Sequence, residues 1–268
     1  IKKDLKMATK DVCCYLGAGV LSVAKKSSYD AKLSGLREFG NTKDFTITPT
    51  VSENKTPNFM TRAGGDACVT QIIESVMVKF TAICHKMDNL ALALYGDYTE
   101  VATAAVVNEA LVAFEGSIVP LSNLPNLSIA PVITDAATDL ITYVEGVDYA
   151  FTEAGALIIL DGTTIPVPLL GVPNIHVDYT KVAQQDLQIF TRASDELVLF
   201  FSGTNRDDTG QLAQLKLFKV KLKTAPFDLI KDGKTTSELV FEGVVIADEN
   251  VPAAGGFSQF GQFLRSKV

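Results

Sequence analysis

The feature that most constrains the fold is the alternation of apolar and polar side chains along several long segments. Between Thr70 and Met87, the side chains of Val76, Val78 and Phe80 fall on one face, and the other face mixes charged with apolar groups. Successive side chains of a strand point to opposite faces, so the pattern predicts a long β-strand with one buried face. Further strands are predicted at Glu196–Ser202, Leu212–Lys223 and Leu239–Ala247.

Between these strands, local signals predict the other elements. Asp88 is placed to cap a short helix over Asn89–Tyr95, which Gly96 would end. Asp44–Val51 alternates like a strand, and Pro49 within it favours an edge position. The Val-rich segment 97–120 favours strand over helix, and Gly17-Ala18-Gly19 predicts a kink or turn.

Two further segments are predicted to be a loop and a helical turn. Residues 52–69 contain turn-forming residues throughout, which predicts a long loop, and loops of that length in compact domains are usually functional. Ala225–Ile230 predicts a short helical turn that begins at Pro226.

Residues 121–181 differ from the rest of the chain. Six of the chain's ten prolines fall between 120 and 173, and the segment contains short strand candidates joined by turn signals. The candidates are Leu140–Val144, Ala156–Leu160 and Ile175–Tyr179. The sequence therefore predicts an all-β, mainly antiparallel fold with one short helix. Its main domain would be discontinuous, 1–120 and 182–268, with a small β module inserted at 121–181.

Charge and targeting signals limit the classes of function. The net charge of −7 disfavours general affinity for nucleic acid, because phosphates are repelled. No run approaches the roughly 18–20 apolar residues of a membrane-spanning helix, and we expect no secretory signal. Buried, reduced thiols are expected for the cysteines, with an inter-subunit disulfide as the alternative. These are Cys13, Cys14, Cys68 and Cys84.

Residue types that carry catalysis do not come together in the sequence. The two histidines, His85 and His176, stand by no nucleophile motif, and the cysteines lack zinc-ligand spacing. Asp207-Asp208 favours a solvated hairpin over a calcium loop. We therefore expect no enzyme activity, no cofactor and no metal.

Two groups of side chains, one of lysines and one of phenylalanines, allow two interpretations each. Lys219, Lys221 and Lys223 form a cationic stripe, either protecting an edge strand or contacting acidic residues of a neighbouring copy. The phenylalanines of the tail would pack on the core or dock on the next subunit. These are Phe257, Phe260 and Phe263.

Several motifs together resemble the major tail tube proteins of tailed bacteriophages. They are IIESVMVKFTAICHKMDNLALALYG, ending at Gly96, and FFSGTNRDDTG…LKLFKVKL…PFDLI…SELVFEGVVIAD in the C-terminal third. YLGAGVLSVAKK and REFGNTKDFTITPT are similar to that family's opening strands. The matches cover most of 11–100 and 184–250, in the family's order.

The resemblance implies a β-barrel or sandwich-like protomer that forms homohexameric rings stacked into a tube. The segment around 52–69 would reach a neighbouring ring, and DNA would pass through the lumen without specific binding. We expect inter-subunit contacts at one set of residues, namely Phe59, Met60, Arg62, Lys79, Lys219, Lys221, Phe257, Phe260 and Phe263.

The same resemblance implies partners and a location. They are a tape-measure protein, tail terminator and baseplate proteins, and a sheath if the tail contracts, with assembly in the host cytoplasm and a final place in the virion tail. Two alternatives stay open: the tube of a contractile injection or secretion system, and a virion-decorating β-sandwich that binds a ligand. The chain length and the inserted module favour the phage tube.

Overall fold

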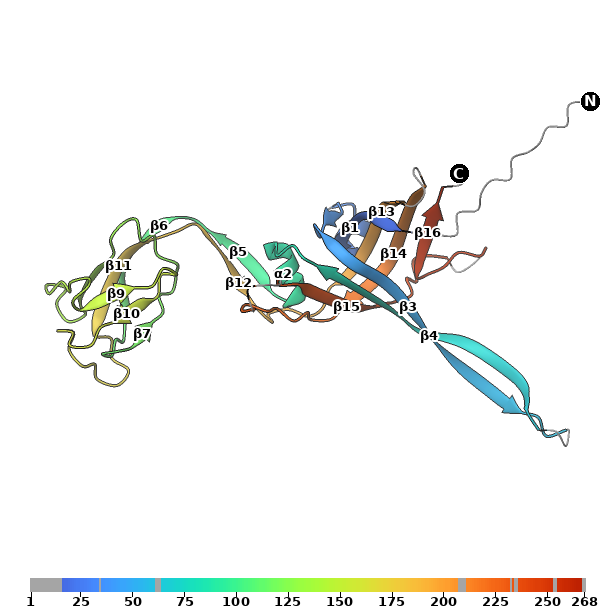
Figure 1. The fold of residues 1–268 in the computed structure, drawn as a ribbon, viewed down its shortest axis with the longest axis horizontal. Coiled ribbons are helices and arrows are strands. Elements are labelled where there is room, and N and C mark those ends of the chain that lie inside the picture. Colours follow the sequence, from blue (N-terminus) through green and yellow to red (C-terminus); the bar gives the residue numbers. More distant parts are fainter. Residues whose placement is uncertain are drawn as a thin grey trace, which may run out of the picture. The chain divides into compact units, whose positions relative to one another are not determined.

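The computed structural model describes residues 16–33, 35–60, 64–206, 211–231, 233, 236–252 and 255–266. The described residues form sixteen strands and two short helices, and the sheets are mainly antiparallel, which confirms the all-β prediction (Figure 1). The chain divides into two compact units. Unit 1 comprises Ile1–Asp97 and Leu187–Val268, and unit 2 comprises Tyr98–Asp186.

Unit 1 is built on one eight-stranded sheet in the order β2-β1-β13-β14-β15-β4-β3, with β16 also paired to β14. Its elements are β1 (Gly17–Lys25), α1 (Lys26–Asp30), β2 (Arg37–Glu38), β3 (Thr42–Pro57), β4 (Asp66–Ala82), α2 (Met87–Ala93), β13 (Glu196–Asn205), β14 (Leu212–Leu222), β15 (Leu239–Val245) and β16 (Gly261–Arg265).

The sheet of unit 1 curves around an aromatic core. The rings of Phe80 and Phe241 stack at 5.1 Å, and Phe39 meets Phe80 edge-on at 4.8 Å. Phe45 of β3 lies 6.1 Å from Phe201 of β13, although three strands separate β3 from β13 in the sheet order. The curvature brings these strands together, but the edge strands β2 and β3 are not hydrogen-bonded to each other, so the described sheet is not a closed barrel.

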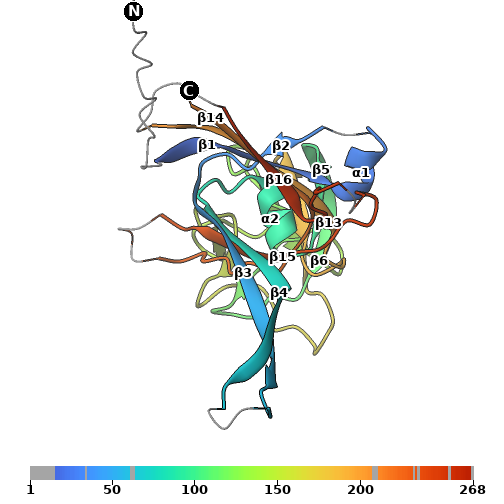
Figure 2. The same ribbon diagram turned by 90° about the vertical axis from the view of Figure 1, so that its right-hand side faces the viewer.

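The alternation of β4 places its side chains as predicted over the second half of the strand. Val76, Val78 and Phe80 are buried, and Lys79 between them is exposed. Core burial of such side chains is the main favourable term in folding. The helix that follows is also present, and it lies within the curve of the sheet in the end-on view (Figure 2).

The ends of that helix differ from the prediction. It spans Met87–Ala93, with Lys86 at the N-cap, and Asp88 lies inside its first turn instead of capping it. The fully buried Asn89 holds the helix instead, since its side-chain amide donates to the carbonyl oxygens of Phe39 and Cys84 at 2.8 and 2.9 Å. A tertiary anchor thus replaces the local cap.

Several other local predictions are wrong. Residues 52–57 and 66–69 are strand, not loop, because β3 and β4 continue to pair backbone to backbone as far as Pro57 opposite Asp66. The helix α1 was not expected, and Ala225–Ile230 is not helical. The glycines at 17 and 19 do not turn the chain, because β1 runs through them.

Gly19 has a different role within β1. It lies directly opposite Gly203 of β13, and a Cβ at Gly19 would stand 2.4 Å from the carbonyl oxygen of Ser202. A Cβ at Gly203 would stand 2.3 Å from the carbonyl oxygen of Ala18. The two strands therefore approach closely only because both positions lack a side chain.

Unit 2 packs two three-stranded sheets, β7-β10-β9 and β6-β11-β8, around one core that includes Ile133, Leu157, Ile175 and Tyr179. A two-stranded sheet of β5 and β12 contains both boundaries with unit 1. The elements are β5 (Asp97–Val101), β6 (Ala104–Leu111), β7 (Ile118–Val119), β8 (Val132–Asp135), β9 (Tyr149–Phe151), β10 (Leu157–Ile159), β11 (Ile175–Lys181) and β12 (Gln184–Gln188).

The predicted insert at 121–181 lies inside unit 2, which starts earlier because β6 pairs with β11. Segment 97–120 contains β5, β6 and β7, as the valine content predicted. Strands at Ala156–Leu160 and Ile175–Tyr179 are confirmed by β10 and β11, whereas Leu140–Val144 holds only an isolated bridge at Thr142.

Candidate self-assembly surface

The outer half of the β3–β4 hairpin projects from unit 1 with both faces in solvent (Figure 1). We define this outer ribbon as Val51–Pro57 and Asp66–Ile73, in which every side chain is exposed. Eight residues of β4 at about 3.3 Å each extend it by ~25 Å. Two strands without a third strand or a core are only marginally stable in water. The ribbon therefore has stability to gain from contact with another molecule.

Apolar side chains are exposed along this ribbon. Val51 and Ile73 face each other across the two strands and are 48% and 55% exposed, and Ile72 and Val69 add to the same hairpin. Cross-strand pairs of branched apolar residues stabilise a hairpin. Here they also leave apolar surface in water, which is typical of an interaction surface.

The tip of the hairpin ends in two large apolar side chains. Phe59 is 88% exposed and Met60 is 96% exposed, and both were expected at an interface. The side chain of Asn58 accepts a hydrogen bond from the Met60 backbone N–H at 2.8 Å, which shapes the tip locally. Arg62, expected at the same interface, lies outside the described residues.

Polar groups of the ribbon pair with each other and leave the apolar ones unpartnered. Lys55 lies 3.0 Å from Glu53, and Gln71 donates to Glu53 at 2.9 Å. The hydrogen bonds from Lys55 and then Gln71 lower the pKa of Glu53. Most charged side chains of the ribbon therefore have partners within the ribbon, so the surface that remains for a partner molecule is apolar.

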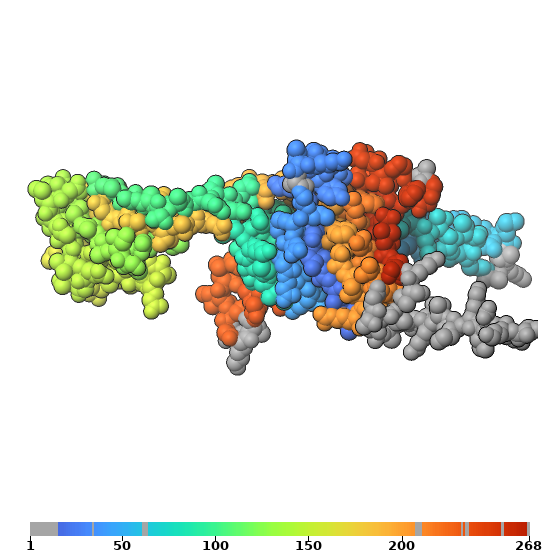
Figure 3. All heavy atoms as spheres, turned by 90° about the horizontal axis from the view of Figure 1, so that it is seen from above, coloured from blue at the N-terminus to red at the C-terminus, as the bar shows by residue number. Residues whose placement is uncertain are grey.

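β3 also forms one edge of the sheet, as Pro49 predicted. Its sixteen residues pair with β4 on one side only. An edge of that length is a template for pairing with another chain, and folded proteins usually cover or blunt such edges. Figure 3 shows this hairpin (cyan) as surface that the other described elements of unit 1 leave uncovered.

The three lysines predicted at the interface have partners within the chain. Lys79 lies 2.8 Å from Glu242, and Lys219 and Lys221 lie 3.2 and 3.3 Å from Glu196. β14 has neighbours on both sides, so the Lys219–Lys223 stripe does not protect an edge. Burial raises the pKa of Glu196, but the two lysines outweigh it and the pKa is lowered.

The phenylalanines of the C-terminal segment separate into two environments. Phe260 packs against the core of unit 1, whereas Phe257 and Phe263 are 68% and 54% exposed. Among the cysteines, Cys68 on the outer ribbon is exposed and Cys84 is half-buried, and both are free thiols. Cys13, Cys14 and the Asp207-Asp208 pair lie outside the described residues.

An apolar groove lies at the end of α2, and no sequence signal pointed to it. We call it the α2 groove. Its volume is about 680 Å³, and it is lined by Leu94, Leu187, Ile189, Phe190, Thr224, Ala225, Pro226, Phe227 and Leu229.

Backbone hydrogen bonds to the last carbonyls of α2 build the walls of the α2 groove. The N–H of Phe190 donates to Leu94 at 2.9 Å, and the N–H of Ala225 donates to Ala93 at 2.9 Å. The last carbonyls of a helix have no partner inside it, so the two crossing segments satisfy them. Two segments far apart in sequence are thereby fixed beside one helix end.

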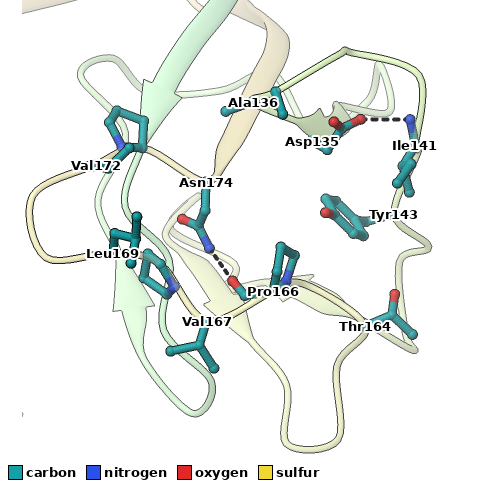
Figure 4. A pocket seen from close by; sticks show the side chains of 13 residues that line it. Asp135, Ala136, Ile141, Tyr143, Thr164, Pro166, Val167, Leu169, Val172 and Asn174 are labelled. Atoms are coloured by element: carbon teal, nitrogen blue, oxygen red, sulfur yellow. Dashed lines mark hydrogen bonds between the residues drawn. The ribbon is translucent and has the colours of Figure 1, made fainter.

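Unit 2 has an apolar pocket of its own, of about 670 Å³ (Figure 4). Val167, Leu169 and Val172 lie along one wall and Ile141 on the other, with the Tyr143 ring directed into the hollow. Burial, followed by the charges of Asp135 and Asp148, raises the pKa of Tyr143. The carboxylate of Asp135, which lines the pocket, disfavours an anionic occupant.

Groups that would support other chemistry are not gathered in the described parts of the chain. Over those residues, no cluster of three or more His, Cys, Asp or Glu side chains could hold a metal ion. His176 pairs with Asp139 at 2.6 Å, as a satisfied strand histidine would. Neither described helix has the length and apolar character needed to cross a membrane.

The fold and these surfaces define an all-β protein of two compact units, the larger of which carries a projecting, partly apolar hairpin. The sequence matches the family described as "Protein of unknown function UCP028589" over residues 14–264, and the chain belongs to that family. No curated protein matches the sequence.

Proposed function

We propose that the protein is a structural subunit that assembles with copies of itself into stacked hexameric rings, forming the DNA-conducting tail tube of a bacteriophage. The observation that carries the proposal is the outer ribbon. Over the part of the chain that the structure describes, it is a two-stranded extension about 25 Å long with exposed apolar side chains and no core of its own. A neighbouring copy supplies the missing cover.

The long edge of β3 supports the same function. Strand addition across an exposed edge joins sheets of separate chains through backbone hydrogen bonds. In a closed ring each edge meets its neighbour, so the exposure that is a hazard in a monomer disappears on assembly. The acidic net charge of −7 suits a conduit that lets DNA pass without holding it.

Unit 2 lies on the outside of such a tube, because a module of 89 residues, Tyr98–Asp186, would obstruct the lumen. Replacing Ala102–Ala183 by a short turn that joins β5 to β12 leaves tube formation intact under this proposal. Loss of assembly in a variant that keeps a folded unit 1 would count against an external position.

The experiment that tests the function is negative-stain electron microscopy of the purified protein over a concentration series, with sedimentation velocity on the same samples. Rings or hollow tubes that grow with concentration are the expected result. A monodisperse monomer at every concentration, also in the presence of tail-initiating proteins, would contradict the proposal.

The pocket of unit 2 favours a second candidate function, a virion-decorating module that binds a ligand. Its apolar walls and buried tyrosine hydroxyl fit a neutral ligand with a hydrogen-bonding group. A monomer in the concentration series, together with saturable binding that Leu169→Asp abolishes, would favour this candidate over the tube.

A further inference from the structure

Two exposed apolar features of unit 1 lie at opposite ends of one strand. The hairpin tip with Phe59 and Met60 precedes β4, and α2 with its groove follows it (Figure 1). β4 has seventeen residues, which is roughly 55 Å at about 3.3 Å each. The tip and the α2 groove of one chain therefore cannot touch each other.

The chemistry of the two features is complementary. The tip presents an aromatic and a flexible thioether side chain, and the groove presents Phe190, Phe227 and Leu229. Aromatic side chains bury about 150–250 Å² each, and methionine adapts to irregular gaps. A volume of about 680 Å³ accommodates both tip side chains.

The backbone of the groove is strained where an aromatic side chain is held outward. Phe190 adopts a φ of +56°, a conformation uncommon for bulky residues, and its side chain remains 64% exposed. Such strain persists only where surrounding contacts impose it, and it concentrates at binding sites. The hydrogen bond from its N–H to Leu94 is one such contact.

We infer that the Phe59–Met60 tip of one copy docks in the α2 groove of the next copy. The inference rests on the proposed self-assembly and names the receiving site for the hairpin. Because the two surfaces differ, the contact is head-to-tail, and each copy that docks leaves a free tip at one end and a free groove at the other. Repetition of such a contact produces an open, polar stack of subunits.

Photo-cross-linking tests the contact directly. Phe59 is replaced by the photo-reactive residue p-benzoylphenylalanine in unlabelled protein. This variant is mixed with ¹⁵N-labelled wild-type protein, and the mixture is assembled and irradiated. Mass spectrometry then locates the cross-linked residues. Cross-links between the isotopic species to 187–190 or 224–229 are expected. Cross-links that fall elsewhere, including the pocket of unit 2, in particles of normal appearance would overturn the inference.

A matched pair of variants separates the groove from its surroundings. Leu229 lines the groove and its neighbour Ile230 does not, and both are strongly exposed, so neither substitution affects folding. Leu229→Ser is expected to raise the concentration for half-assembly by about tenfold or more, with Ile230→Ser unchanged. Equal behaviour of the two variants would overturn the inference.

These outcomes are distinct from failure of the proposed function. If wild-type protein never assembles, the tube proposal fails before the docking site is in question. If wild-type protein assembles normally while both groove tests give the overturning result, self-assembly stands and only the receiving site is wrong.

Discussion

The two halves of the β3–β4 hairpin have the same strands and the same pairing but opposite surroundings. In the inner half, β15 pairs with β4 and the side chains of Val78 and Phe80 are buried. In the outer half, no third strand of the described residues pairs with the hairpin, and Val51 and Ile73 face solvent. Backbone pairing therefore makes both halves strand, whereas the surrounding elements decide whether each half stabilises its own chain or is available to another.

The division has a structural marker. A bulge lies between the two halves, where the register shifts between Thr50 and Val51. An extra residue at a bulge bends the hairpin and increases its twist. The inner half can thus follow the curved sheet while the outer ribbon leaves it.

The largest expected effect comes from removing the outer ribbon. Replacing Ser52–Ile72 by Asn-Gly joins the paired residues Val51 and Ile73 through a two-residue turn. We expect assembly to be lost while the thermal midpoint of the monomer stays close to wild type, because the removed part touches no core. Calorimetry measures the thermal midpoint and electron microscopy measures assembly. A large fall in the midpoint would show that the outer ribbon stabilises its own chain, contrary to the comparison.

Next in size is a cavity in the inner half. Phe80 is fully buried between Phe39 and Phe241, so Phe80→Ala should reduce the free energy of unfolding by about 3–5 kcal/mol. Urea unfolding measures this change. A loss below about 1 kcal/mol would show that the inner half is not the stabilising part of the hairpin.

A charged contact in unit 1 gives a smaller, pH-dependent effect. Lys26 lies 2.8 Å from the buried Asp248. Burial raises the pKa of Asp248, but the hydrogen bond and charge of Lys26 outweigh it, so the pKa is lowered. A carboxyl with a lowered pKa in the folded state stabilises above its unfolded pKa of about 3.9, and this contribution disappears as the pH falls through the folded value.

Asp248→Asn should therefore cost about 1–3 kcal/mol at neutral pH, because it leaves a largely buried lysine with one fewer partner. The difference from wild type should shrink under strongly acidic conditions, as shown by urea unfolding across a pH series. A difference that stays constant with pH would mean that packing, and not charge, links these residues.

The smallest effect on stability is expected for a single apolar residue of the outer ribbon. Ile72 is 57% exposed, so Ile72→Ser should change the free energy of unfolding by less than about 0.5 kcal/mol. Assembly should nevertheless weaken several-fold, as measured by sedimentation. A matched exposed residue away from the hairpin, Leu33, should affect neither property when changed to serine.

The sequence predicted what local pattern encodes. The period of two identified β4 and β14, a nearly continuous apolar run identified β13, and Gly96 marked the neighbourhood where α2 ends. Residues 52–57 and 66–69 of the outer ribbon are predicted as loop from sequence, because SENKTP is rich in turn-forming residues and neither face shows an apolar pattern. Backbone pairing with β4 decided that segment, and pairing partners are not visible in one strand alone.

The candidate site was predicted only at its tip. Phe59 and Met60 stand together in sequence, whereas the α2 groove gathers Leu94, Phe190 and Leu229 from three distant segments. Lys79, Lys219 and Lys221 are expected at an inter-subunit contact, which stays a prediction; the pairs that they form with Glu242 and Glu196 in the same chain could not be read from the sequence. Contacts between residues so far apart in sequence arise only from the folded arrangement.

The facing glycines of β1 and β13 give the N-terminal part of the sheet a single alignment. If β1 slipped by one residue, the side chain of Ala18 or Val20 would take the place of Gly19 opposite Gly203, where a Cβ stands 2.4 Å from the carbonyl oxygen of Ser202. Glycine-rich strands usually slide easily and exchange between molecules. The Gly19–Gly203 pair therefore fixes the register of β1 on β13 and disfavours pairing of the two strands in any shifted register.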